Sequence, residues 1–241
     1  MESFFNIAIM DALFTTFLVI HIAGGSTALI AGFIAMLAMK GSSVHRKAGK
    51  VFFWGMTAAC SAAVYLSIAH DIPFLLMIAV FSYQLVAIGY RSLWIKKLFT
   101  GTIKPKWVDW LIGIVPAVFN ISIIIWGINR IMHGNNFGIT GIVFGAIGLR
   151  YAFNWIKSFY VHPKEKQHWL FSHLQGFGAA YIAATTAFLV VNARFIPGVK
   201  FLPDWTVWLM PAAIGATLIT LTTIKYKKKF SRNEKVKYIT D

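Results

Sequence analysis

The sequence predicts an all-α, polytopic membrane protein with seven transmembrane helices. Of its 241 residues, 58% are hydrophobic and only 13% are charged, whereas a soluble domain has about 25% charged residues. The mean hydropathy is +0.66. Apolar runs of the length that a bilayer core of about 30 Å requires recur along the whole chain. None of them shows the alternation, over segments of about 10 residues, that is typical of a membrane β-barrel.

The interruptions between the apolar runs set the limits of each predicted helix. In chain order they are KGSSVHRKAGK, HDIP, KKLFTGTIKPK, NRIMHGNN, VHPKEKQ and ARFIPGVKFLPD. The first run is not expected to be a cleaved signal peptide, because Glu2 and Asp11 stand where a signal peptide is basic. The predicted spans are residues 12–39, 48–70, 72–95, 107–128, 137–158, 168–193 and 205–225. We expect one membrane domain, residues 1–225, and a basic cytoplasmic tail, residues 226–241.

The distribution of Lys and Arg predicts the orientation of the chain. These residues are frequent in loops 40–50, 96–106 and 157–167 and in the tail, and sparse in the loops between them. The positive-inside rule then puts the N-terminus outside and the C-terminus in the cytoplasm. We expect the protein to span the inner (cytoplasmic) membrane of the cell. Because the net charge of +15 is distributed in this way, we expect the lipid bilayer, and no nucleic acid, among the partners.

Ionisable side chains inside the predicted spans are candidates for a functional site, because a charge in lipid is costly. Each also has a structural explanation, which is snorkelling to the head groups for an arginine and hydrogen bonding between helices for a histidine. A single cysteine, Cys60, excludes a disulfide or a Cys-based metal site within one chain. The candidate cofactor-binding residues are His21, His45, His168, His173, Arg91 and Arg150, and His21 and His173 are the candidate metal ligands.

Uncharged polar residues and glycines in the spans are expected to serve helix packing. Gln84 and Asn120 lie near mid-depth, where amide side chains commonly form hydrogen bonds between helices. Small residues allow two helices to approach closely. The glycines for which we expect this role are Gly24, Gly25, Gly32, Gly176 and Gly178.

Acidic residues are missing from the middle of every predicted span. All eight fall in the termini, the loops or the span ends. We therefore expect no carboxylate partner within the spans for Arg91 or Arg150. A buried Arg150 would instead be balanced by backbone carbonyls, lipid phosphates or a bound anion. The same absence argues against a proton pump. A retinal protein would need a lysine within the last span, and this span has none before Lys225 at its inner end.

Three segments carry a resemblance to a known family: HIAGGSTALIAGFIAML, HRKAGKVFFW and QHWLFSHLQGFGAA. Together they resemble the bacterial multi-span membrane family catalogued as domain of unknown function 2306, over the first two predicted helices and, less closely, the sixth. The resemblance implies a polytopic inner-membrane protein without an established activity. The family-like positions are His21, His45 with Arg46 and Gly49, and His168 with Trp169.

A more distant likeness is to b-type membrane cytochromes, in which histidines on neighbouring helices ligate haem. The sequence departs from that pattern. His21 is predicted in the outer half of the membrane and His173 in the inner half, so we do not expect them to share one iron. His168 and His173 are five residues apart, or about 140° around a helix, and point different ways.

Three functions remain open from the sequence, and enzyme activity is uncertain. The first is a polar, cationic cavity that binds a small anionic or amphipathic ligand, such as an anionic lipid, in a transporter, a sensor or an assembly factor. The second is a histidine-ligated haem b redox protein, with arginines for the propionates. The third is a zinc-dependent membrane hydrolase. Such a hydrolase needs an acid near its histidines, and Asp71, Asp109 and Glu165 are only remotely placed.

Overall fold

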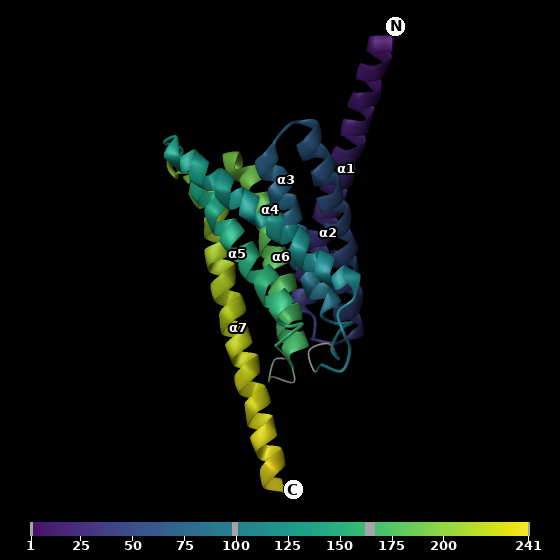
Figure 1. Cartoon of the computed structure of the whole chain (residues 1–241), viewed down its shortest axis with the longest axis vertical. Coiled ribbons are helices and arrows are strands. Elements are labelled where there is room, and N and C mark those ends of the chain that lie inside the picture. Colours follow the sequence, from purple (N-terminus) through teal and green to yellow (C-terminus); the bar gives the residue numbers. More distant parts are fainter. Residues whose placement is uncertain (1, 98–100, 162–166, 241) are drawn as a thin grey trace.

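A computed structural model describes residues 2–97, 101–161 and 167–240 of the chain (Figure 1). Over these ranges the chain forms helices, turns and loops, and no β-strand. Seven of the helices are long and apolar enough to cross a membrane, which confirms the predicted all-α class and the number of candidate spans. The helices are α1 (Glu2–Leu37), α2 (Ser43–Ala69), α3 (Pro73–Arg91), α4 (Trp107–Met132), α5 (Gly138–Lys157), α6 (His168–Asn192) and α7 (Asp204–Thr240), with short 3₁₀ turns η1 (Ala193–Phe195) and η2 (Val199–Phe201) before α7.

The limits of several helices differ from those predicted: α1 begins ten residues early, at Glu2, α3 ends at Arg91 and α4 continues to Met132. The difference in α2 affects a candidate residue. α2 begins at Ser43, five residues before the predicted start, because the Ser42 side chain caps it by accepting a hydrogen bond from the His45 backbone N–H (3.2 Å). His45 therefore stands on the first turn of a helix rather than in a loop. At the other end of the chain, α7 continues past residue 225 as one helix to Thr240.

The bundle is built from two helix hairpins around a central helix. α1 packs along α2, α4 packs along α5, and α3 lies among α2, α4, α5 and α6. α7 packs on α6 and touches α5. The largest cluster of buried apolar side chains joins α1, α2, α3, α5 and α6, and it includes Phe52, Met56, Leu85, Phe144 and Ala180. α3 is accordingly the most buried of the seven spans.

Glycines bring neighbouring helices into backbone contact at several crossings. A Cβ atom added at Gly24 would lie 2.9 Å from the Gly55 carbonyl oxygen, and one added at Gly176 would lie 2.7 Å from the Gly89 Cα. At Gly25, by contrast, an added Cβ would meet nothing within 4 Å, so the predicted packing role is wrong there. It is confirmed for Gly24, Gly32, Gly176 and Gly178.

A buried amide network joins α3, α4 and α5. The Asn120 side chain donates to the Gln84 carbonyl oxygen (2.9 Å), and the Gln84 amide donates to the Gly148 backbone oxygen (3.1 Å). Both side chains are 1% exposed. The prediction that these two residues bond between helices is confirmed, and their polar groups are satisfied by protein alone.

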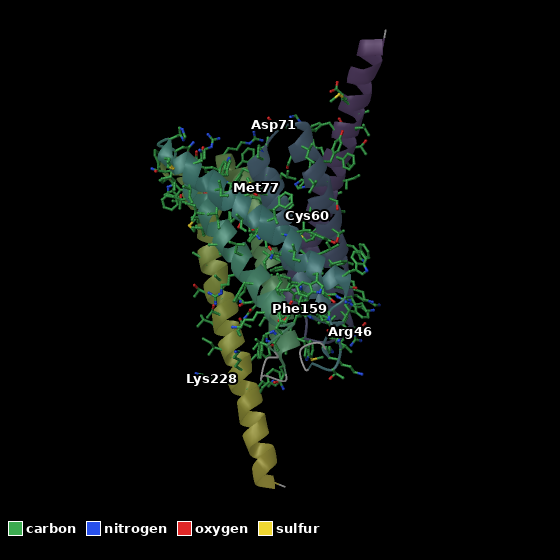
Figure 2. All side chains as sticks on the ribbon, viewed as in Figure 1. Arg46, Cys60, Asp71, Met77, Phe159 and Lys228 are labelled. Atoms are coloured by element: carbon green, nitrogen blue, oxygen red, sulfur yellow. The ribbon has the colours of Figure 1, made fainter. Side chains whose placement is uncertain are left out.

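The two ends of the bundle differ in charge. α3 and α5 end, and α2, α4 and α6 begin, at the lower end in Figure 1. We call it the basic end, because Lys40, Arg46, Lys96 and Lys157 stand at or next to these helix ends. In Figure 2, Arg46 and Lys228 are toward this end and Asp71 is at the opposite one. Large apolar side chains such as Ile30, Phe33 and Ile125 point outward between the two ends, as a lipid-facing surface requires.

Candidate functional site: a cationic cavity and a histidine pair

A cavity of about 810 Å³ lies among α3, α5, α6 and α7. α7 closes one side of it, and the inner faces of α3, α5 and α6 form the rest. The end remote from the basic end is apolar, with Phe81, Phe144, Ala183 and Ala212 in its wall. This volume is within the range of about 300–1,000 Å³ that ligand pockets have.

The walls of this cavity become cationic toward the basic end. Arg150 and Lys157 of α5, His168 of α6 and Lys227 of α7 all line it there, and the described lining residues include no Asp or Glu. Arg150 and Lys157 are on the same face of α5, with Asn154 between them. Hydroxyl and amide groups of the neighbouring helices lie alongside: Ser172, Gln175, Thr220 and Thr223.

Arg150 carries the deepest positive charge in this wall. Its side chain is exposed to the cavity and the surface, and it forms no ion pair with any residue in the described ranges. The neighbouring Tyr151 hydroxyl donates instead to the Gln175 backbone oxygen (3.3 Å), which links α5 to α6. At the mouth, the Lys227 ammonium lies 5.2 Å from the centre of the Phe171 ring. Arg150 therefore presents to the cavity a positive charge that an anionic group can contact.

Arg91 has a carboxylate partner, so the expectation of none is wrong. Its Nε and Nη2 donate to the two oxygens of Asp109 (2.6 and 3.2 Å), and Asp109 also accepts from the Lys106 backbone N–H (2.8 Å). Asp109 is 1% exposed, on the first turn of α4. The Trp155 indole donates to the Asp109 backbone oxygen (2.8 Å). Arg91 is thus held in a bidentate ion pair that fastens α3 to α4, away from the cavity lining.

His45 and His173 face each other across the basic end of the bundle. The Nδ1 atom of His45 lies 2.9 Å from the Ala35 carbonyl oxygen of α1, and that of His173 lies 3.0 Å from the Gly89 carbonyl oxygen of α3. The centroids of the two rings are 6.3 Å apart and their planes are at 85°. Lys40 also donates to the Ala35 oxygen (3.1 Å), and partial burial lowers the pKa of its ammonium.

The structure places His21 in a different part of the bundle. Its Nδ1 lies 2.9 Å from the Ala59 carbonyl oxygen of α2. Ala59 is fourteen residues from His45 along α2, or about 21 Å, so His21 and His173 cannot share one metal ion, as expected from their depths. His70 packs its ring on Phe14 (4.5 Å), seven residues and about 10 Å from His21 along α1. His21 and His70 therefore lie in different surroundings.

The six candidate residues therefore separate into four places. Arg150 and His168 line the cavity, His45 and His173 form a pair, Arg91 binds Asp109, and His21 bridges α1 and α2. His168 and His173 do face different surroundings, as their spacing predicts. In the described ranges, no group of three or more His, Cys, Asp or Glu is arranged to hold a metal ion, so the three-ligand site that a zinc hydrolase needs is not formed there.

Two residues of the cavity were not among the sequence candidates. Lys157 was interpreted only as an orientation signal at the end of its span, and Lys227 was placed in the basic tail, for which we expected contact with lipid but no part in a binding site. The signal that could have found them is positional: Lys157 is seven residues, or two helical turns, after Arg150, and so lies on the same helix face.

Comparison of the chain with protein-family models, with curated proteins and with solved structures gives no match. The resemblance to the domain of unknown function 2306 family stays a prediction.

Proposed function

We propose that this protein binds an amphipathic anion, most simply a lipid with an anionic head group, in the cavity among α3, α5, α6 and α7. The observation that carries the proposal is the polarity of the cavity wall. Its cations, Arg150, Lys157 and Lys227, gather at the basic end, and its apolar residues occupy the rest. A ligand with one charged end and one apolar end satisfies both parts at once.

The length of the cavity supports a lipid that lies parallel to the helices. Its lining on α7 runs from Ala212 to Lys227, fifteen residues and about 22 Å along the helix. One leaflet of a hydrocarbon core of about 30 Å is about 15 Å thick. An acyl chain beside Ala212 and Ala216 would therefore bring its head group to the level of Lys157 and Lys227.

The orientation proposed for the chain fits the same ligand. With the N-terminus outside and the C-terminus in the cytoplasm of the inner membrane, the basic end faces the cytoplasmic leaflet. Anionic lipids give this leaflet a negative surface potential, and each basic residue near it contributes about 1 kcal/mol of attraction. A transporter, a sensor and an assembly factor are all covered by this proposal, since each recognises such a ligand by non-covalent binding.

Native mass spectrometry of the full chain, purified from membranes that contain equal amounts of an anionic and a zwitterionic phospholipid, tests the proposal. Wild-type protein should retain the anionic lipid preferentially. The variant Arg150→Gln/Lys157→Gln/Lys227→Gln should bind it more weakly by up to about 3 kcal/mol, or on the order of a hundredfold.

The matched control is Lys47→Gln/Lys50→Gln/Lys104→Gln, which removes the same charge from exposed positions at the same end, outside the cavity lining. It should retain the lipid as wild type does. Equal loss of lipid from both triple variants would show that only net charge matters and would refute the cavity as the site.

A further inference from the structure

The helices α5 and α6 run antiparallel along the cavity, and two contacts show which of their residues lie at the same level. The Tyr151 hydroxyl of α5 donates to the Gln175 backbone oxygen of α6 (3.3 Å). Nearer the basic end, Trp169 of α6 packs against the apolar cluster that includes Trp155 and Phe159. Counting along both helices from these contacts gives three pairs of cavity residues at matching levels. They are Arg150 with Gln175, Asn154 with Ser172, and Lys157 with His168.

Positive charge in the cavity wall is concentrated at two of these levels. Arg150 stands at the deeper one. Lys157 is seven residues further on, about 10 Å along α5, and its ammonium lies 5.8 Å from the centre of the exposed Phe153 ring, at the rim of the cavity. Lys227 of α7 joins the level of Lys157, because its ammonium lies beside the Phe171 ring in the first turn of α6.

Uncharged polar side chains occupy the level between the two cationic ones. Asn154 and Ser172 line the cavity there from α5 and α6. Neither side chain forms a hydrogen bond with any residue in the described ranges. An amide and a hydroxyl together offer both donors and acceptors, so this level suits an uncharged hydroxyl group of a ligand better than a further anion.

We propose that the lipid bound in this cavity has a head group of two phosphates joined by a glycerol. One phosphate contacts Arg150, the other contacts Lys157 and Lys227, and the glycerol hydroxyl lies at the level of Asn154. Six covalent bonds separate the two phosphorus atoms, as many as separate Cα atoms two residues apart, so the extended linker places them about 7 Å apart. Long cationic side chains attached about 10 Å apart along one helix reach both phosphates.

Head groups with other charge patterns fit the two levels less well. A single phosphate occupies one level at a time and leaves the cation of the other level without an anion. The two phosphates of a diphosphate ester share one oxygen, so they are too close together to serve both levels. The described cavity lining includes no Asp or Glu that would compete for Arg150, and a guanidinium binds a phosphate through two parallel hydrogen bonds.

The opening of the cavity accommodates the acyl chains of such a lipid. Arg150 and Asn154 of α5, and Ala216 and Thr220 of α7, both line the cavity and are exposed. The cavity therefore opens between α5 and α7, and chains that it does not hold extend there into the bilayer. This inference rests on the proposed function, because it specifies the head group of the same lipid.

The test measures, by native mass spectrometry of the full chain, the binding of two lipids at equal phosphate concentration. The first is a tetraoleoyl lipid with two phosphates joined by a glycerol, and the second is dioleoyl phosphatidylglycerol, which has one phosphate. Because the second phosphate reaches a second cationic level, wild type should bind the first lipid at least about fivefold more tightly. This comparison needs no variant to fold.

Two variants each remove one cationic level: Arg150→Gln the deeper one, and Lys157→Gln/Lys227→Gln the one at the rim. Both should bind the two lipids equally. The matched controls, Lys104→Gln and Lys47→Gln/Lys104→Gln, remove the same charge from exposed positions outside the cavity lining and should keep the wild-type preference.

Each other result overturns the inference. Equal binding of the two lipids by wild type would overturn it and leave the proposed anionic-lipid site standing, whereas retention of neither lipid would overturn both. A preference that persists in both level variants, or that the controls lose as well, would also overturn the assignment of one phosphate to each level.

Discussion

The crossing of α3 and α6 predicts a large effect from one added methyl group, at Gly176. A Cβ there would lie 2.7 Å from both the Cα and the nitrogen of Gly89 and 2.9 Å from the Leu85 oxygen. These are backbone atoms and cannot rotate aside, so the helices must separate by about 1 Å to reach an ordinary carbon contact of about 3.5–4.0 Å. Overpacking of this kind costs up to about 3 kcal/mol, and the better helix propensity of alanine offsets about 1 kcal/mol.

Gly176→Ala should therefore lose about 2 kcal/mol, which for a chain of this size lowers the apparent Tm by about 4–8 °C. Thermal unfolding in detergent, followed by tryptophan fluorescence, measures it. The control is Gly25→Ala, where the new Cβ meets nothing within 4 Å and helix propensity alone should leave the Tm unchanged or up to about 4 °C higher. The same Tm for both variants would refute the close α3–α6 contact.

The same assay tests three polar contacts. Asp109→Asn leaves Arg91, which is 26% exposed, without its counter-charge and should lower the free energy of unfolding by about 3 kcal/mol. The control Asp204→Asn, at an exposed helix start, should lower it by under about 1 kcal/mol. Equal losses for the two variants would contradict the ion pair. Gln84→Ala should lower the free energy of unfolding by about 2 kcal/mol, because the buried Asn120 amide loses its acceptor. Gln84→Leu/Asn120→Leu should lower it by less than either single change to leucine. Additive losses would contradict the network. Ser42→Ala should cost about 1 kcal/mol by removing the cap of α2, and an unchanged Tm would show that the cap does not hold the first turn.

The apolar runs were sufficient to predict the seven helices, because the need for about 20 apolar residues per span leaves little freedom in their placement. The amide bonds of Gln84 and Asn120 were predictable for a similar reason, since buried amides need partners. The Arg91–Asp109 pair was missed because it joins two helices across a loop, and the depth of each residue alone does not give their relative rotation.

The histidine pair and the cavity depend on features that the sequence pattern did not specify. Residue 45 was assigned to a loop because the apolar run begins at residue 48, while the Ser42 cap extends α2 backward by more than one turn. The pairing with His173 then follows from how α6 crosses α2 and α3. Lys157 was counted among the orientation charges and Lys227 was assigned to the basic tail, because only the packing of α7 beside α5 and α6 shows which lysines line a cavity.

The most direct test of the central proposal is to map where an anionic lipid binds, using a photoactivatable phospholipid with the reactive group on its acyl chain. The account predicts adducts on the apolar cavity wall, at residues such as Ala183 and Ala216, that decrease when unlabelled anionic lipid is added and persist when zwitterionic lipid is added. Adducts spread evenly over outward-facing residues such as Ile30 and Ile125, with no dependence on head-group charge, would contradict it.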